Sequence, residues 1–459
     1  MALAGGLAAP LSMPLAGPLS VPGRIEFDRR AGPVGDLIEA SLTRPGADPE
    51  LAAFYAARGE RPLWVQGRRL RPETREVVFL VERAGEEDLD PADYHPGELA
   101  EAVHSAASGR PADLARAELA LSAALGAYAE DLHRAKPAAQ LLYSDPAFPP
   151  PDLDRRSTLE LLAAARSLGA GLDALRRMNP LYEQFRAALA EEVARGGPNV
   201  DVIRANLERA RALPVELGRR YILVDVTTQR LWAYEAGQPV FSMKVIVGKP
   251  SEPTPAMAAV VRYAVFRPYW NVPPDLVSAN VAPKVLKYGM TYFRGEHLEV
   301  LSDWTDGARV LDPTKVNWRA VALGRKELRV RQRPGPDNMM GRVKFIFPNE
   351  LGVYLHDSPL RPLFAPDERL FSSGCIRLED APRLARWLLG EAALAAGQGP
   401  GPPETRTDLP EPTPVYILYL TAAPSAAGVA LRKDVYGRDA ALLAELGPAE
   451  PSASWLASW

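Results

Sequence analysis

Tyr221-Ile222-Leu223-Val224-Asp225-Val226 marks the point where the pattern of the chain changes from helical to β. The run is followed by Leu231-Trp232-Ala233-Tyr234, a turn containing Gly237, and a further apolar run over residues 241–247. Short runs rich in β-branched and aromatic residues, joined by tight turns, indicate antiparallel strands. Further strands are predicted over residues 259–266, 343–347, 353–356 and 415–420. The sequence therefore predicts a β-rich domain over residues 215–445.

A long, irregular insertion is predicted inside this domain, over residues 271–342. The segment is rich in proline, glycine and aromatic residues. A connection of that length within a compact domain is usually functional, so we expect a lid over a cleft. Residues 397–414, also rich in proline and glycine, are predicted to form a surface excursion.

The preceding part of the chain, residues 34–214, has a helical pattern. Leu114, Leu121, Leu125, Tyr128 and Leu132 recur at helical spacing, and similar periodic runs occur over residues 73–83, 158–177 and 181–194. Together with the β-rich region this predicts an α+β protein in which a mostly helical N-terminal domain precedes the β domain.

The composition limits the classes of function. A chain of 459 residues predicts two or three domains, and 47% apolar with 24% charged residues is typical of a globular protein. A net charge of -3 gives no reason to expect a nucleic-acid partner. Residues 1–33 are predicted to be a disordered leader or the remnant of a signal, because the first 23 residues carry no basic n-region. Residues 446–459 are predicted to be a tail.

The single cysteine, Cys375, is the most informative residue for function. One thiol cannot form an internal disulfide, and one thiol with one imidazole is too few ligands for a closed zinc site. We therefore predict no metal and no cofactor. Two interpretations remain open: an inert buried thiol, or a nucleophile with His356 as its general base.

The residues around Cys375 favour the nucleophile. His356 ends a predicted strand and is expected to face an opening, and Arg377 and the imidazole would both favour the thiolate. The amides of Gly374 and Cys375 could form an anion-binding nest for a tetrahedral oxyanion. Neither Asp nor Asn is placed by the sequence to complete a triad, so a backbone carbonyl is the expected group to orient His356.

At these residues the sequence resembles a known family. Ser372-Ser373-Gly374-Cys375-Ile376-Arg377, with His356 nineteen residues before the cysteine, resembles the active-site signature of the L,D-transpeptidase (YkuD-type) catalytic domain. Pro268-Tyr269-Trp270-Asn271-Val272-Pro273-Pro274 and Arg331-Gln332-Arg333-Pro334-Gly335 are similar to the large periplasmic, YcbB-like members. Phe54-Tyr55, Trp64 and residues 88–94 resemble their helical scaffold domain.

The resemblance implies a reaction on peptidoglycan. Cys375 would attack a tetrapeptide stem between its third residue, commonly meso-diaminopimelate, and D-Ala, releasing D-Ala and leaving a thioester. The side-chain amine of a second stem would then attack the thioester, giving a 3→3 cross-link. His356 would be the general base, and the amides of Gly374 and Cys375 the oxyanion donors. Such members act in the periplasm and are acylated by carbapenems, so export is expected although the signal is incomplete.

The resemblance also suggests substrate contacts and partners. Arg377 and Ser373 would shape the donor side, and Tyr354 and Trp270 would contact the stem peptide unless they only pack in the core. The expected partners are the donor and acceptor stems, with cell-wall synthesis proteins as further candidates. Many relatives insert a peptidoglycan-binding module between two landmarks, near Asn179 and Val202, that only about twenty residues separate here. Alternatives are an L,D-carboxypeptidase, a protein-to-peptidoglycan anchoring enzyme, or a non-catalytic cell-wall-binding scaffold.

Overall fold

The computed structural model describes residues 32–151, 153–425 and 428–448, which fall into two compact units. The first unit combines Met1–His133 with Asp152–Arg177, and the second combines Arg134–Pro151 with Met178–Trp459. Most of the predicted leader (residues 1–31) and of the predicted tail (residues 449–459) lies outside the described residues.

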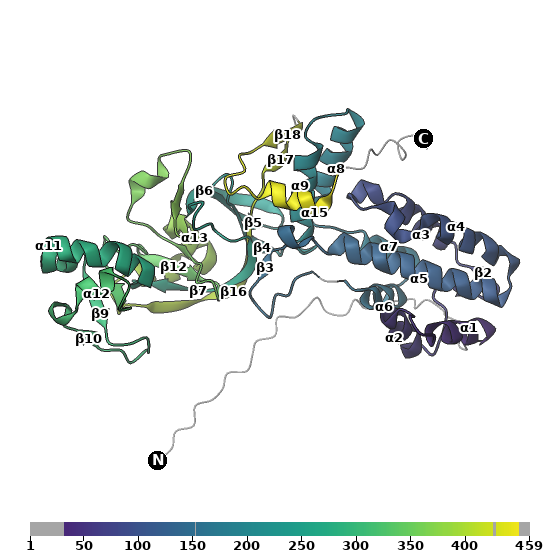
Figure 1. The fold of residues 1–459 in the computed structure, drawn as a ribbon, viewed down its shortest axis with the longest axis horizontal. Coiled ribbons are helices and arrows are strands. Elements are labelled where there is room, and N and C mark those ends of the chain that lie inside the picture. The colour runs from purple at the N-terminus through teal and green to yellow at the C-terminus, as the bar shows by residue number, and fades with distance from the viewer. Residues whose placement is uncertain (1–31, 152, 426–427, 449–459) are drawn as a thin grey trace, which may run out of the picture. The chain divides into compact units, whose positions relative to one another are not determined.

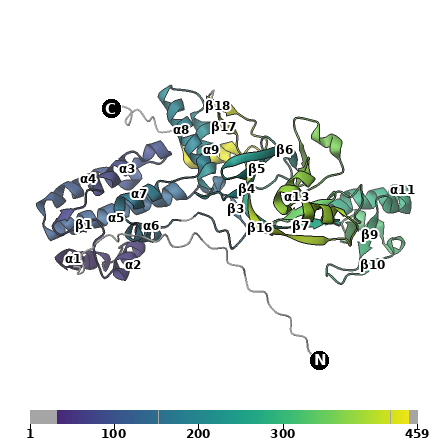
Figure 2. The same ribbon diagram turned by 180° about the vertical axis from the view of Figure 1, so that it is seen from behind.

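The first unit is built around one long helix, α5 (Pro111–His133), which confirms the helical period at Leu114 to Leu132. Helices α1, α3, α4 and α6 contact α5, as Figures 1 and 2 show from opposite sides. Asp48 and Ser167 cap α2 and α7 by accepting hydrogen bonds from backbone amides of their first turns. The other elements are α1 (Gly32–Leu42), α2 (Pro49–Ala57), β1 (Val65–Gln66), β2 (Arg69–Leu70), α3 (Thr74–Glu82), α4 (Pro96–Ser105), α6 (Arg155–Ala164) and α7 (Leu168–Leu175).

The second unit contains a ten-stranded sheet in the order β12-β13-β15-β6-β5-β4-β16-β7-β3, with β14 paired to β6. The sheet closes on itself because β12 also pairs with β7, so its apolar side chains surround an enclosed core. Its strands are β3 (Leu142–Tyr143), β4 (Arg220–Asp225), β5 (Arg230–Glu235), β6 (Gln238–Gly248), β7 (Met257–Phe266), β12 (Val343–Ile346), β13 (Leu355–His356), β14 (Leu370–Ser372), β15 (Ile376–Leu378) and β16 (Thr405–Leu418).

The sheet is mixed, so the expectation of an antiparallel sheet is wrong for part of it. The hairpins β4–β5 and β5–β6 are antiparallel as predicted, but β13–β15, β16–β4, β3–β7 and β14–β6 are parallel. Tight turns report only on strands that follow each other in the chain, and parallel partners are joined by longer connections. The predicted strands at 221–226 through 415–420 are all found, with shifted ends.

The predicted surface excursion over residues 397–414 is wrong in its second half. Strand β16 begins at Thr405, and its residues Thr405–Asp408 pair with β7 before the register shifts between Asp408 and Thr413. Pro410 and Pro412 lie within that irregularity, where a missing amide costs no ladder hydrogen bond. The surface segment is limited to the residues between α14 (Glu391–Gln398) and β16.

The insertion over residues 271–342 is regular, not irregular as expected. It has its own four-stranded sheet, in the order β10-β9-β11-β8, and its own buried apolar cluster, which includes Val285, Phe293, Val300 and Trp318. Figures 1 and 2 show α11, α12, β9 and β10 gathered as one group. The elements are β8 (Trp270–Val272), α10 (Pro274–Leu276), a π-helical turn (Val277–Val281), α11 (Ala282–Gly295), β9 (Leu298–Leu301), β10 (Val310–Leu311), α12 (Trp318–Ala322) and β11 (Arg329–Gln332).

The helices α8 (Pro180–Ala194) and α9 (Val200–Arg211) belong to the second packing unit. Both contact β17 (Ala422–Ser425), which pairs with β18 (Gly428–Leu431), and α9 also contacts α15 (Asp439–Leu446). Arg209 of α9 forms an ion pair with Asp439 at 2.6 Å. The domain boundary at residue 214 stays a prediction, but the packing units divide the chain before α8.

Helix α13 (Ala381–Leu389) follows the segment that contains Cys375. Asp380 caps it by accepting a hydrogen bond from the Arg383 amide at 3.0 Å, and Pro382 lies in its first turn. Its apolar face is buried in the core of the closed sheet and consists of Ala381, Leu384, Ala385 and Leu388. This helix fixes the end of β15, and thereby the chain direction just after Cys375.

Candidate active site

The register of two adjacent parallel strands brings the predicted site residues together. Leu355 of β13 is paired with Ile376 of β15, and His356 with Arg377. Leu355 and Ile376 are fully buried in the core of the closed sheet. Because side chains alternate along a strand, His356 and Arg377 lie on the opposite face.

The same alternation places two more predicted residues on that face, Tyr354 before His356 and Cys375 before Arg377. The amide of Ile376 donates to the Tyr354 carbonyl at 3.0 Å, so the pairing continues to these positions. The positive charge of Arg377 favours a lower pKa for both Cys375 and His356, and a Cys375 thiolate would in turn favour a higher pKa for Arg377. The four polar side chains therefore form one cluster on the outer face of the sheet.

His356 is buried, with 2% of its surface exposed, and does not face an opening as expected. Its Nδ1 lies 2.6 Å from the backbone carbonyl oxygen of Asp357, which can only accept a hydrogen bond. Nδ1 therefore carries the hydrogen, and the neutral ring has its lone pair at Nε2. The group that orients the ring is thus a backbone carbonyl.

The environment keeps the His356 ring neutral. Burial and the positive charges of Arg377 and Lys344 lower its pKa to about 3, although the carbonyls of Asp357 and Met340 oppose this shift. The neutral imidazole has the free lone pair that a general base needs, but a pKa this far below neutrality makes the resting ring a weak base.

Cys375 is partly exposed, and its Sγ lies 3.6 Å from the carbonyl oxygen of Gly352. Burial raises the pKa of the thiol, and the lowering effects of the Tyr354 backbone and Arg377 are smaller. Arg377 thus favours the thiolate as expected, but desolvation outweighs it. In the resting state Cys375 is therefore a thiol and His356 a neutral imidazole.

The loop before Cys375 is held from both sides. Gly374 has a φ of +100°, a conformation that a residue with a Cβ rarely adopts. The hydroxyl of Thr254 donates to the Gly374 carbonyl at 2.8 Å, and the hydroxyl of Ser372 donates to the Cys375 carbonyl at 2.5 Å. Ser373 is exposed, and its side chain interacts with Glu252.

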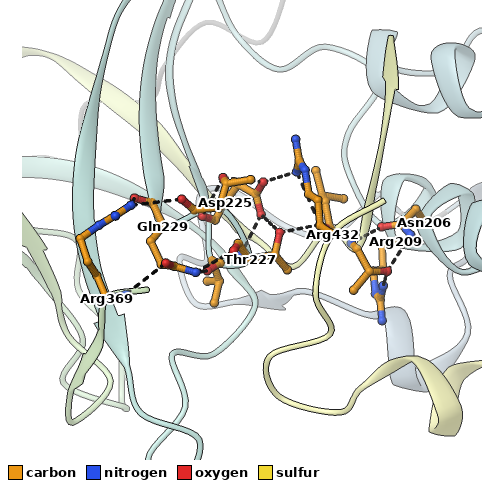
Figure 3. Close-up of polar contacts among 11 residues, drawn as sticks. Asn206, Arg209, Asp225, Thr227, Gln229, Arg369 and Arg432 are labelled. Carbon is orange, nitrogen blue, oxygen red and sulfur yellow. Dashed lines mark hydrogen bonds and ion pairs between the residues drawn. The ribbon is translucent and has the colours of Figure 1, made fainter. Parts of the chain in front are cut away.

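Arg369, which the sequence did not suggest, anchors the strand that leads into this loop. Its guanidinium is 4% exposed and donates to five backbone carbonyls at 2.7–3.3 Å, belonging to Thr228, Gln229, Val245, Pro366 and Asp367. Figure 3 shows Arg369 facing Gln229, whose side-chain oxygen accepts from the Arg369 amide at 3.2 Å. An isolated arginine between Glu368 and Leu370 has no sequence signal for this role, because three of its five acceptors come from the distant segments around Thr228 and Val245.

A polar network continues from Gln229 through the turn between β4 and β5 (Figure 3). Asp225 accepts from the Thr227 amide at 3.1 Å and forms an ion pair with Arg432. Beyond Arg432, Asn206 of α9 donates to Thr421 at 2.9 Å. The network thus ties the C-terminal segment and α9 to the turn that holds Arg369.

The comparisons with known proteins agree with this geometry. Residues 219–417 match the L,D-transpeptidase catalytic domain family (YkuD), and residues 49–189 match the Scaffold domain family. Residues 219–417 thus form a domain of the L,D-transpeptidase catalytic family. The resemblance that the cysteine motif suggested is therefore confirmed, together with the order of a helical scaffold before the catalytic domain.

Relatives of this L,D-transpeptidase domain are found among known proteins. A Haemophilus influenzae protein named as an L,D-transpeptidase is 32% identical over 243 residues, which are 51% of this chain and 47% of that protein. The chain thus spans about half the length of this curated relative. Among solved structures, the L,D-transpeptidase from Mycobacterium smegmatis is 13% identical and covers 43% of this chain and 58% of its own, with a TM-score of 0.22. The catalytic domain of the E. faecium L,D-transpeptidase is 18% identical, and the match covers 43% of this chain and 96% of that domain, with a TM-score of 0.19.

Trp270 is the predicted site residue that the structure assigns to a different cluster. It lies on β8, paired with Gln332 of β11, and packs half-buried against the apolar core of the insertion. Its expected contact with the stem peptide therefore stays a prediction, and core packing accounts for its position.

In the described ranges, no group of three or more His, Cys, Asp or Glu side chains could hold a metal ion. No helix within those ranges is long and apolar enough to cross a membrane.

Proposed function

We propose that this L,D-transpeptidase forms 3→3 cross-links between peptidoglycan stem peptides through an acyl-enzyme on Cys375. The observation that supports the proposal is the strand pairing that sets His356 of β13 opposite Arg377 of β15, with Cys375 directly before β15. The family of the domain supplies the substrate class, a donor stem and an acceptor stem.

The first half-reaction would begin from the neutral pair. Nε2 of His356 takes the thiol proton as Sγ of Cys375 attacks the carbonyl carbon between the third stem residue and D-Ala. The carbonyl oxygen becomes an oxyanion, which the amides of Gly374 and Cys375 stabilise. Collapse of the tetrahedral intermediate breaks the C–N bond. His356 returns its proton to the leaving D-Ala amine, and a thioester remains.

The second half-reaction would reverse these proton transfers. The side-chain amine of a second stem attacks the thioester carbonyl, and His356 removes its proton. The C–S bond then breaks, and the sulfur recovers a proton from the imidazolium. In both halves the Asp357 carbonyl stabilises the imidazolium, because it accepts from Nδ1 at 2.6 Å.

The remaining predicted residues would bind the stems. Arg377 carries a positive charge on the face shared with Cys375, which suits a carboxylate of the donor stem. Ser373 is exposed beside the nucleophile, and Tyr354 precedes His356 on the same face. The folded insertion, with Trp270 on its first strand, would act as the lid that selects the acceptor. Because its substrate is the cell wall, we place the enzyme in the periplasm.

The proposal is tested with purified protein and a disaccharide-tetrapeptide, with products identified by mass spectrometry. We expect dimers that have lost one D-Ala, and none with Cys375→Ala. Trimmed monomers alone would replace transpeptidation with carboxypeptidase activity. The absence of any Cys375-dependent product would leave a non-catalytic binding scaffold.

A further inference from the structure

We propose that Thr254 is a positioning residue that aims the Cys375 amide at the developing oxyanion. This inference deepens the proposed function and rests on its acyl-transfer chemistry. It concerns the direction of a backbone N–H group.

The hydrogen bonds of Thr254 have only one possible direction. Thr254 is fully buried in the connection between β6 and β7. Its Oγ1 accepts from the Gly248 amide at 2.9 Å and donates to the Gly374 carbonyl at 2.8 Å. An amide can only donate and a carbonyl can only accept, so the single hydroxyl proton must point at Gly374.

This hydrogen bond orients the peptide unit that contains the Cys375 amide. The carbonyl of Gly374 and the N–H of Cys375 belong to one planar trans peptide, in which they point in opposite directions. Thr254 therefore turns the Cys375 N–H away from itself, and polarisation of the carbonyl makes that N–H a better donor. Ser372 fixes the next carbonyl, that of Cys375, at 2.5 Å.

The turn that carries Thr254 is itself rigidly held. A Cβ on Gly248 would lie 2.2 Å from the Glu252 carbonyl oxygen and 2.6 Å from the Thr254 nitrogen, so only glycine allows the turn to fold back this tightly. The Tyr436 hydroxyl donates to the Gly248 carbonyl at 2.6 Å and accepts from the Thr254 amide at 3.3 Å. The Thr254 hydroxyl is thus fixed relative to the loop that it orients.

The test separates acylation from simple thiol reactivity in the full chain. p-Nitrophenyl acetate acylates a thiol through a tetrahedral oxyanion, whereas iodoacetamide alkylates it by displacement of iodide without one. Because Cys375 is the only cysteine, iodoacetamide modification of a thiol can only be modification of Cys375. The acylation rate of Cys375→Ala, which measures reaction at other groups, is subtracted from that of each variant. Thr254→Val removes the hydroxyl and keeps the shape, and Thr254→Ser keeps the hydroxyl.

We expect Thr254→Val to slow acylation by about tenfold or more, less than the ~100-fold typical of deleting an oxyanion donor. Alkylation should stay within about twofold of the wild type, since it needs no oxyanion donor. Thr254→Ser should restore acylation. The matched control is Thr158→Val in α6, where a buried hydroxyl also donates to a carbonyl, that of Asp154, at 2.9 Å.

Equal slowing of both reactions would assign Thr254 a merely structural role, and unchanged acylation would also overturn the inference. Neither reagent is a peptidoglycan fragment. If the disaccharide-tetrapeptide gives no product while this pattern is seen, the proposed substrate fails and the role of Thr254 stands.

Discussion

Each of the two units contains a buried ionisable side chain that hydrogen-bonds mainly to backbone groups. The two side chains have opposite charges when they are ionised. In the first unit, Glu118 is fully buried and accepts hydrogen bonds from the amides of Leu63, Trp64 and Val65, and from the hydroxyl of Tyr55. In the second unit, Arg369 donates to five backbone carbonyls. Burial raises the pKa of Glu118 and lowers that of Arg369, and it disfavours the charged form in both.

The difference between them lies in what each one holds. Glu118 attaches the segment around Trp64 to helix α5, and the predicted site residues all lie in the other unit. Arg369 lies directly before β14, the strand that leads into the loop of Gly374 and Cys375. Both side chains provide hydrogen-bond partners for backbone groups outside regular ladders. In the first unit Glu118 therefore supports the fold alone, whereas in the second unit Arg369 supports the fold and the reactive loop.

The largest effect should follow from Arg369→Met, which leaves five backbone carbonyls without this donor, those of Gln229 and Val245 in buried surroundings. We expect a loss of about 4 kcal/mol in the free energy of unfolding of the second unit. Acylation of Cys375 should fall by about 100-fold, because reacting groups displaced by 1 Å lose rate on that scale. Urea unfolding and the p-nitrophenyl acetate reaction measure the two effects. Arg369→Lys keeps the charge but has fewer hydrogen-bond donors, so its stability and its acylation rate should lie between those of the wild type and Arg369→Met.

If the Arg369→Met protein folds and Cys375 is acylated at the wild-type rate, the proposed difference between Arg369 and Glu118 is wrong. Arg369 would then support the fold only, as Glu118 does.

Local patterns in the sequence predicted the elements of both units. Period 3.6 marked α5, and short runs rich in β-branched and aromatic residues between turns marked the strands, because these signals lie within each element's own residues. The motif around Cys375 and His356 was visible for a similar reason, since its residues are near neighbours in the chain. These features need no knowledge of distant contacts.

The parts that were missed depend on contacts between distant segments. Three kinds of contact join residues more than a hundred positions apart: the parallel pairing of β16 with β4, the hydrogen bond from Thr254 to Gly374, and the bonds from Arg369 to the carbonyls of Thr228, Gln229 and Val245. The core of the insertion was missed because its short elements are broken by proline and glycine. The neutral state of His356 could not be predicted either, since burial sets it.

His356 provides the second prediction, because it is a buried ionisable group that the fold keeps neutral. Its pKa is lowered from 6.5 to about 3, so below pH 6.5 the unfolded chain binds a proton that the folded chain does not. Stability should therefore fall as the pH decreases from about 6.5 towards 3. At pH 4.5 the loss from this group should be about 2–3 kcal/mol.

The measurement is urea unfolding between pH 7.5 and 4.5 for the wild type and His356→Gln, which cannot titrate. Other groups titrate in both proteins, so the difference between the two curves isolates His356. Parallel curves would show that the ring gains its proton in the folded state as easily as in the unfolded chain.

The smallest effect should come from Glu118→Gln, which neutralises the carboxylate and replaces one acceptor oxygen with a donor. At least one of the three amides at Leu63, Trp64 and Val65 then loses its acceptor, at a cost of about 2 kcal/mol to the first unit. Hydrogen exchange at these amides should speed up by about 30-fold. Acylation of Cys375 should not change. The control is Glu101→Gln, at an exposed glutamate of α4, which should alter neither the hydrogen exchange of these amides nor the acylation of Cys375. A loss of acylation in Glu118→Gln would show that the scaffold also supports the reactive loop, and the two buried charges would then have the same role.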